Sequence, residues 1–178
     1  MSAPWERATP SPPPPPCPLD ELGVDVMSAA RLSRALQRSP RLFERLCAPE
    51  ERWEWTAPEG AGLAWACALW CAKEAAVKTL RTGFWREGID WPMVVVGAEA
   101  AGLIAASVER ASSNPRNPPD LRALTPEEVW ARWAAWRRAR LTDEAARRWG
   151  GRALWCCAVE REGLAWGWGG LSAPSASP

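Results

Sequence analysis

The sequence predicts an α+β domain, in which long helices occur together with short apolar strands. The strongest helical signal runs from Ala68 to Leu80, and residues 89–96 and 153–159 have the length and composition of buried strands. At 178 residues, with 47% apolar and 24% charged residues, the chain has the size and composition of one globular domain. We expect this domain to cover residues 19–170.

Both ends of the chain are predicted to be disordered tails. Residues 1–18 contain five consecutive prolines, Pro12 to Pro16, which favour an extended, solvated segment. A role as a proline-rich ligand is the alternative, and a solvated tail is the preferred interpretation. Residues 171–178 consist mainly of serine, proline and alanine and are also expected to be disordered.

The domain begins with a short strand and two short helices. Residues 22–26 have strand-like alternation that is interrupted by Asp25. Ser28 is suited to cap the helix that follows, and Ser39-Pro40 interrupts that helix before a second one starts.

The Ala68–Leu80 helix is expected to end near Gly83 and to be buried on one side. Lys73, Glu74 and Lys78 interrupt its apolar character. Glu74 and Lys78 are four residues apart, so an ordinary surface ion pair between them is one interpretation and a functional role is the other.

The second half of the chain is less regular. Residues 98–110 are interpreted as a helix or a helix and a turn, and residues 111–120 as a loop. Another helix is expected to end at Gly150-Gly151. The chain then leaves the domain through the glycine-rich residues 163–170.

A helix rich in tryptophan and arginine is predicted for residues 126–140, opening with Thr125 as its N-cap. Val129, Trp133 and Trp136 form a stripe along it that is interpreted as core. If this stripe were exposed, the helix could bind nucleic acid or dock on an acidic partner.

The composition excludes several classes of protein. Histidine is absent, which rules out Ser-His-Asp and Cys-His catalytic systems and histidine-ligated zinc. The net charge of +1 provides no general attraction to nucleic acid or to a membrane surface. The six cysteines contain no C-x-x-C pair, and no run is long enough to span a membrane. With no signal peptide at the N-terminus, a reduced, cytoplasmic protein is expected.

Three segments in this order resemble the 4′-phosphopantetheinyl transferases, and most closely the small holo-acyl-carrier-protein synthase type. They are Gly23-Val24-Asp25 with Arg31, Arg41-Leu42-Phe43-Glu44-Arg45-Leu46, and Ala72-Lys73-Glu74-Ala75 with Lys78. The resemblance covers residues 22–97 and returns weakly at 153–161, so residues 98–148 form a divergent part of the domain. It implies a small antiparallel sheet packed against helices.

The resemblance implies Mg²⁺-dependent transfer of 4′-phosphopantetheine from coenzyme A to a serine of an acyl or peptidyl carrier protein, releasing 3′,5′-ADP. Asp25 and Glu74 are then the metal ligands, and carboxylates are ligands that Mg²⁺ prefers. Glu74, or a water on the metal, is expected to take the proton of the serine. Lys78, with help from Lys73, is expected to contact the phosphates of coenzyme A.

Partners also follow from the resemblance. Arg31 lies where the family contacts the acidic helix of the carrier protein, although a solvated helix arginine explains it equally well. The small branch assembles as a homotrimer, which we expect here. Two features depart from the family: Leu69 stands near a usual basic residue, and the later S-x-[ST]-H motif is missing, with Arg147 or Arg148 near its place. A catalytically inactive homologue that binds a partner through the tryptophan and arginine helix is therefore the alternative function.

Overall fold

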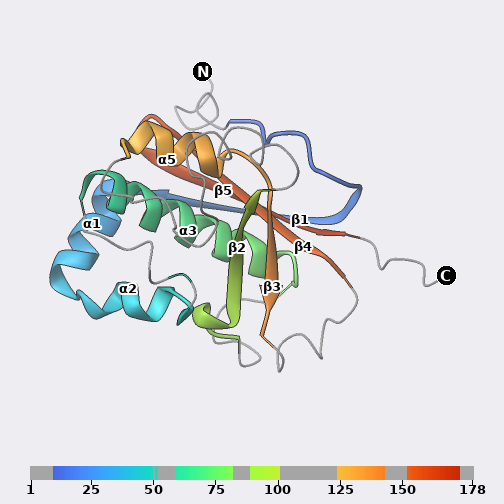
Figure 1. The fold of residues 1–178 in the computed structure, drawn as a ribbon, viewed down its shortest axis with the longest axis horizontal. Coiled ribbons are helices and arrows are strands. Elements are labelled where there is room, and N and C mark those ends of the chain that lie inside the picture. Colours follow the sequence, from blue (N-terminus) through green and yellow to red (C-terminus); the bar gives the residue numbers. More distant parts are fainter. Residues whose placement is uncertain are drawn as a thin grey trace, which may run out of the picture.

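The computed structural model shows a five-stranded antiparallel sheet with helices packed against it (Figure 1). It describes residues 10–49, 51, 59–81, 89–100, 124–142 and 152–172. The strand order is β1-β5-β4-β3-β2, with every neighbouring pair antiparallel. This arrangement confirms the predicted α+β fold with a small antiparallel sheet.

The strands are β1 (Leu19–Ser28), β2 (Val94–Ala100), β3 (Arg137–Leu141), β4 (Leu154–Arg161) and β5 (Leu164–Ser172). The helices are α1 (Ala29–Arg38), α2 (Arg41–Leu46), α3 (Gly60–Lys78), α5 (Pro126–Trp133) and the 3-10 turn η4 (Trp91–Met93). Within the described ranges, β1 and β2 form the two edges of the sheet.

Helix α3 is the central element of the fold (Figure 1). It packs on β1, β4 and β5 on one side and against α1 and α5 on the other. It begins at Gly60 rather than at Ala68, and it is buried nearly all round. The expectation of a helix buried on one side was therefore wrong, because helices cover the side that the sheet leaves open.

The sheet approaches α3 closely where three glycines face it. A side-chain carbon added at Gly23 of β1, or at Gly167 or Gly169 of β5, would lie less than 3.0 Å from backbone atoms of Cys71 or Ala75. Real side-chain carbons essentially never come so near, so these positions require glycine. The main chains of β1 and β5 thus rest directly on the main chain of α3.

The capping signals in the sequence are confirmed. The Ser28 hydroxyl accepts a hydrogen bond from the backbone N–H of Arg31 at 3.4 Å and caps α1. Thr125 and Glu128 form a reciprocal capping box at the start of α5.

The tryptophan and arginine helix is shorter than predicted. Helix α5 ends at Trp133, and residues 137–141 form β3 rather than a continuation of the helix. Arg137 and Ala139 are buried while Arg138 and Arg140 are exposed, the two-residue alternation of a strand. Pairing with β2 and β4 on both sides has overridden the helical preference of these residues.

The apolar stripe of that region is core, as predicted. Val129 is 1% and Trp133 0% exposed, and both belong to the core between the sheet and the helices. Trp136 is also buried but lies on the opposite face of the sheet, in a cluster with Cys157, Trp166 and Trp168. The stripe is therefore not available as a recognition surface.

Strand β5 was not predicted, since residues 163–170 were interpreted as an exit from the domain. The glycines that weaken its strand signal are tolerated because α3 lies against them. The other strands are confirmed with shifted limits: β1 is longer than residues 22–26, β4 matches residues 153–159, and η4 replaces the start of the strand predicted at 89–96.

The proline-rich segment contacts the domain where it is described. Trp136 Nε1 donates a hydrogen bond to the Pro13 carbonyl at 2.9 Å. Residues 1–9 and 173–178 lie outside the described residues, as do 101–123 and 143–151, which include most of the divergent part and both Arg147 and Arg148. Among the helices that are described, none combines the length and apolar character needed to cross a membrane.

Candidate functional site

Asp25, Glu74 and Lys78 come together where β1 passes the C-terminal turns of α3. Lys78 Nζ lies 2.7 Å from Asp25 Oδ1 and also donates to the Val24 carbonyl at 2.9 Å. The Lys78 side chain is 45% exposed and that of Asp25 16% exposed, so the pair is open to solvent on the lysine side. An ordinary surface pair with Glu74 was one of the two interpretations of Lys78, and the structure pairs Lys78 with Asp25 instead.

Glu74 is partly buried beside this pair. Trp91 Nε1 donates a hydrogen bond to Glu74 Oε1 at 3.3 Å. Burial raises the pKa of the Glu74 carboxyl, and the negative charge of Asp25 raises it further, while the Trp91 hydrogen bond and the Lys78 charge lower it. The two carboxylates therefore lie close enough to repel each other electrostatically.

This arrangement of carboxylates fits Mg²⁺. A divalent cation between Asp25 and Glu74 would offset their mutual repulsion and the cost of burying Glu74. Over the described ranges, the acidic and cysteine residues form no cluster of three or more that could hold an ion alone. Mg²⁺ commonly takes one or two carboxylates and completes its shell with water and substrate phosphates, so two ligands suffice.

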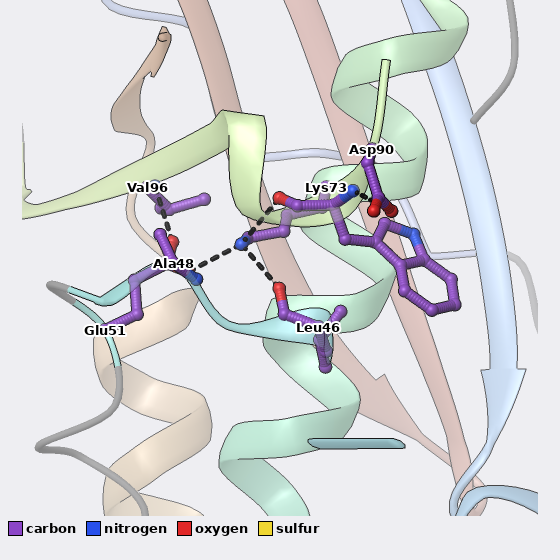
Figure 2. A network of polar contacts seen from close by, with 7 residues as sticks. Leu46, Ala48, Glu51, Lys73, Asp90 and Val96 are labelled. Carbon is purple, nitrogen blue, oxygen red and sulfur yellow. Dashed lines mark hydrogen bonds and ion pairs between the residues drawn. The ribbon is translucent and has the colours of Figure 1, made fainter. Parts of the chain in front are cut away.

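Lys73 does not reach this site, contrary to the expectation that it helps Lys78 with phosphates. Its side chain is 0% exposed, and its ammonium donates to the Leu46 carbonyl at 2.8 Å, the Trp91 carbonyl at 3.1 Å and Glu51 Oε2 at 2.5 Å (Figure 2). An ammonium has three protons, so all of them are used within the protein. Lys73 therefore has no proton left to donate to a phosphate.

The partner of Lys73 is equally well bonded. Besides the ion pair, the Glu51 carboxylate accepts from the backbone N–H groups of Ala48 at 2.7 Å and Val96 at 2.8 Å (Figure 2). Burial lowers the pKa of Lys73 and raises that of Glu51, and each charge opposes the shift of the other. The pair joins the segment after α2, helix α3 and strand β2.

Arg31 lies outside the cluster, on the first turn of α1, and is exposed. Arg34 and Arg38 are exposed on the same helix, and no acidic residue occurs between Ala29 and Arg38. Residues three, four or seven positions apart share one side of a helix. Helix α1 therefore presents a row of positive charges to solvent.

Cys71 lies next to the site without reactive character. Burial raises the pKa of its thiol well above the ordinary value, and the nearby Asp25 charge raises it further. The thiol donates to the Ala165 carbonyl at 3.4 Å. A thiol that stays protonated is a poor nucleophile, and Cys71 acts here as a small core residue.

Two residues near the site received no role from the sequence. Trp91 was interpreted only as part of the buried strand at residues 89–96, and Glu51 was assigned no role. Trp91 and Glu51 bond to α3 residues that lie 17 and 22 positions away from them in the chain. No local sequence pattern reveals contacts over such separations. A buried lysine at position 73 would have required a carboxylate partner, which is the one indirect signal for Glu51.

Sequence comparison identifies relatives of this chain. The profile of the 4′-phosphopantetheinyl transferase superfamily matches residues 21–112, just over half of the chain. A holo-acyl-carrier-protein synthase of Alkaliphilus metalliredigens is 35% identical over 81 residues, which cover 46% of this chain and 64% of the relative. The similarity thus spans less than two thirds of the length of that relative.

Solved structures share the fold at low sequence identity. The holo-acyl-carrier-protein synthase of Neisseria meningitidis matches with a TM-score of 0.58 and 15% identity, covering 87% of this chain and 99% of its own. The holo-acyl-carrier-protein synthase of Bacillus anthracis, solved in complex with CoA, matches with a TM-score of 0.53 and 16% identity, covering 87% and 98%.

The profile match contains the glycine and aspartate of β1 and the Glu74 and Lys78 turns of α3, which are the segments that the fold brings together. The chain therefore belongs to the 4′-phosphopantetheinyl transferase superfamily.

Proposed function

We propose that this protein transfers 4′-phosphopantetheine from coenzyme A to a serine hydroxyl of an apo acyl or peptidyl carrier protein, with Mg²⁺ bound and with release of 3′,5′-ADP. The observation that carries the proposal is the meeting of Asp25, Glu74 and Lys78 between β1 and α3. Family membership and the holo-acyl-carrier-protein synthase relatives support the same reaction.

The reaction requires little covalent chemistry from the protein. A serine hydroxyl attacks the pyrophosphate of coenzyme A, so the protein positions the reactants and compensates negative charge. Mg²⁺ held by Asp25 and Glu74 would supply most of that charge compensation. Lys78 is half exposed beside Asp25, so a phosphate that reaches this site would meet its ammonium as a positive point charge.

Glu74 is the proposed general base. Its carboxylate is partly buried and borders the ion pair, and the chain contains no histidine that could accept the serine proton instead. Oε1 is held by Trp91, which leaves the second carboxylate oxygen for the metal or the serine proton.

Coenzyme A is the proposed donor because the Bacillus anthracis fold relative was solved with it. Leu69 stands near the place of a basic residue that is usual in the family. It is 0% exposed on the buried side of α3, so this position does not face a ligand. The charges that meet coenzyme A in our proposal are therefore Lys78 and the metal.

Incubation of the protein with CoA, Mg²⁺ and an apo carrier protein tests the proposal directly. We expect mass spectrometry to detect the phosphopantetheine mass gain on the carrier serine, and expect a chelator to abolish it. Carrier proteins of fatty-acid, polyketide and peptide synthesis should be tried in parallel. No mass gain on any of them would refute the proposed activity and favour the inactive, partner-binding alternative.

Carrier-protein docking is proposed for the positive row on α1. Arg31, Arg34 and Arg38 are exposed and no acidic residue of α1 neutralises them. Carrier proteins are typically acidic, and opposite charges across an interface accelerate association and orient the partner. Strand β1 leads directly into α1, and Arg31 lies only six residues after Asp25 in the chain. A carrier protein bound there would have its serine near the metal ligands.

Reversal of charge at this row is expected to weaken carrier binding. In Arg31→Glu we expect the KM for the carrier protein to rise about tenfold, equivalent to about 1.4 kcal/mol, with the KM for CoA unchanged. Steady-state kinetics at two salt concentrations measure this, and the difference should shrink at high salt.

Arg138→Glu on β3 is a matched control, since Arg138 is exposed and the net charge changes by the same amount. An equal rise of the carrier KM in both variants would mean that total charge, rather than α1, governs the encounter.

A homotrimer is the proposed assembly. Leu22, Val24 and Val26 alternate along β1 and are 63%, 45% and 48% exposed. They form a continuous apolar strip at one edge of the sheet, a feature that marks interaction surfaces. A second copy of the chain would cover this strip and place a neighbouring subunit against β1, on the face of the strand opposite to Asp25.

Light scattering should give about three times the chain mass of 19.6 kDa. Val24→Asp is expected to lower that mass toward a monomer, because an aspartate in an apolar contact carries an uncompensated charge. Gln37→Asp, at an exposed position of α1, should leave the mass unchanged. A wild-type chain that is monomeric at assay concentration would contradict the trimer.

The proposed cellular location is the cytoplasm. Cys17, Cys67, Cys71, Cys156 and Cys157 form no disulfide, and burial raises the pKa of the last four thiols, to about 12 for Cys67 and Cys156. Unpaired, buried thiols accord with a reducing compartment.

A further inference from the structure

We propose that Trp91 is a positioning residue that holds the Glu74 carboxylate in the orientation needed to bind the metal. This inference rests on the proposed function, since it assigns a second layer of support to the proposed metal ligand. It extends the site from the three residues at β1 and α3 to the 3-10 turn that precedes β2.

The contact between the two residues is direct. Trp91 Nε1 donates to Glu74 Oε1 at 3.3 Å, at the long end for such a bond, and the charge of the acceptor strengthens it. A glutamate side chain has three rotatable bonds, so without a partner its carboxylate samples several orientations. A donor fixed on Oε1 restricts that sampling and leaves Oε2 for the ion.

Trp91 is itself held in place. The residue is 4% exposed, and its ring centroid lies 4.4 Å from that of Trp70, one turn before Glu74 on α3. Its backbone N–H donates to Asp90 Oδ1 at 2.8 Å, and its carbonyl accepts from Lys73 Nζ at 3.1 Å. The indole N–H therefore comes from a side chain with little freedom to move.

The Lys73 bond connects this support to the buried ion pair. Lys73 is anchored by Glu51, and Glu51 by two backbone N–H groups (Figure 2). A continuous series of bonds thus runs from Glu51 through Lys73 and Trp91 to Glu74. Lys73 therefore supports the site through its bond to Trp91, although its ammonium does not reach the proposed metal or phosphate positions.

A hydrogen-bond partner for a buried indole N–H, such as Trp91 has in Glu74, is not general among the tryptophans of this protein. In the described parts of the chain, four other tryptophans have a buried indole N–H without a hydrogen-bond partner: Trp65, Trp133, Trp155 and Trp166. Packing alone accounts for those rings. At Trp91 the N–H meets a carboxylate that is a proposed metal ligand, and bonds of this kind to a ligand orient it and raise its affinity for the ion.

The test compares metal binding in wild type and Trp91→Phe, which keeps an aromatic ring and removes the N–H. Mn²⁺ serves as the probe, and the electron paramagnetic resonance signal of free Mn²⁺ reports binding without any turnover. We expect the Mn²⁺ Kd to rise about 10- to 100-fold. Excess Mg²⁺ should restore most of kcat in the variant, as mass action requires when a metal ligand is only misoriented.

Trp65→Phe is the matched control. Trp65 lies on the same helix as Glu74, is 6% exposed, and its indole N–H has no partner, so the substitution removes the same atoms without a hydrogen bond. Its Mn²⁺ Kd should stay within about twofold of wild type. If circular dichroism shows that Trp91→Phe is unfolded, Trp91→Met, which also lacks the N–H, replaces it.

The outcomes separate this inference from the proposed function. Wild-type protein that neither binds Mn²⁺ nor modifies a carrier protein would refute the proposed function, and the role of Trp91 with it. Wild type that does both, with a folded Trp91 variant of unchanged Mn²⁺ Kd, would refute the positioning role alone. A raised Kd that excess Mg²⁺ compensates would support it.

Discussion

Replacement of Glu74 by glutamine is expected to slow phosphopantetheine transfer about 10²- to 10⁴-fold at saturating CoA and carrier protein, the range for loss of a general base. Glutamine has nearly the same shape but carries no charge, so it cannot take the serine proton and is a weaker ligand for Mg²⁺. The rate can be followed by mass spectrometry of the carrier protein. Mn²⁺ binding should weaken in the same variant.

Glu59→Gln is the matched control for this prediction. Glu59 is exposed immediately before α3 and makes no side-chain cap bond, and Glu74 follows it by 15 residues, roughly 20 Å along the helix. Its transfer rate should equal that of wild type. A Glu74→Gln enzyme within about threefold of wild type would exclude Glu74 as both base and essential ligand.

Replacement of Lys73 by methionine is expected to lower the free energy of unfolding by about 3–5 kcal/mol, the usual result when one partner of a buried ion pair is removed. Methionine fills a similar volume, but the Glu51 carboxylate remains buried, 4% exposed, with two N–H donors and no opposite charge. Urea unfolding would measure this as a lower midpoint with an unchanged slope.

The double variant Lys73→Met with Glu51→Gln separates the effect of losing the ion pair from the effect of changing the side-chain volume. Because it removes both charges, it should regain a large part of the stability that the single variant loses. A Lys73→Met protein of wild-type stability but with a raised KM for CoA would instead support the phosphate contact expected from the sequence, and would contradict the buried network.

The resemblance to the transferase family assigned Asp25, Glu74 and Lys78 to one site, whereas the residue pattern alone left an ordinary surface pair between Glu74 and Lys78 open. Asp25 interrupts an apolar strand, and Glu74 and Lys78 interrupt an apolar helix, so each is a charge where burial is expected. Lys73 satisfied the same criterion and was misplaced. The criterion finds charges in apolar surroundings, but it does not tell a charge that faces the site from one that is neutralised in the core.

Strands β3 and β5 show where local patterns fail. Arg137 to Leu141 continue the composition of α5, and only pairing with two neighbouring strands makes them extended. The glycines of β5 suggested a flexible exit, yet they are required by the close approach of α3. Both errors come from contacts between residues distant in the chain, which composition and periodicity do not record.

The glycine contact also separates the spacing of two carboxylates from the choice of core side chains. At Gly23, main chain meets main chain, so no core side chain sets the spacing between Asp25 on β1 and Glu74 on α3. The core around α3 can then exchange its side chains during evolution without altering the distance between these two carboxylates. A sequence with 14 tryptophans and no tyrosine can therefore keep Asp25 and Glu74 together while the core around them differs.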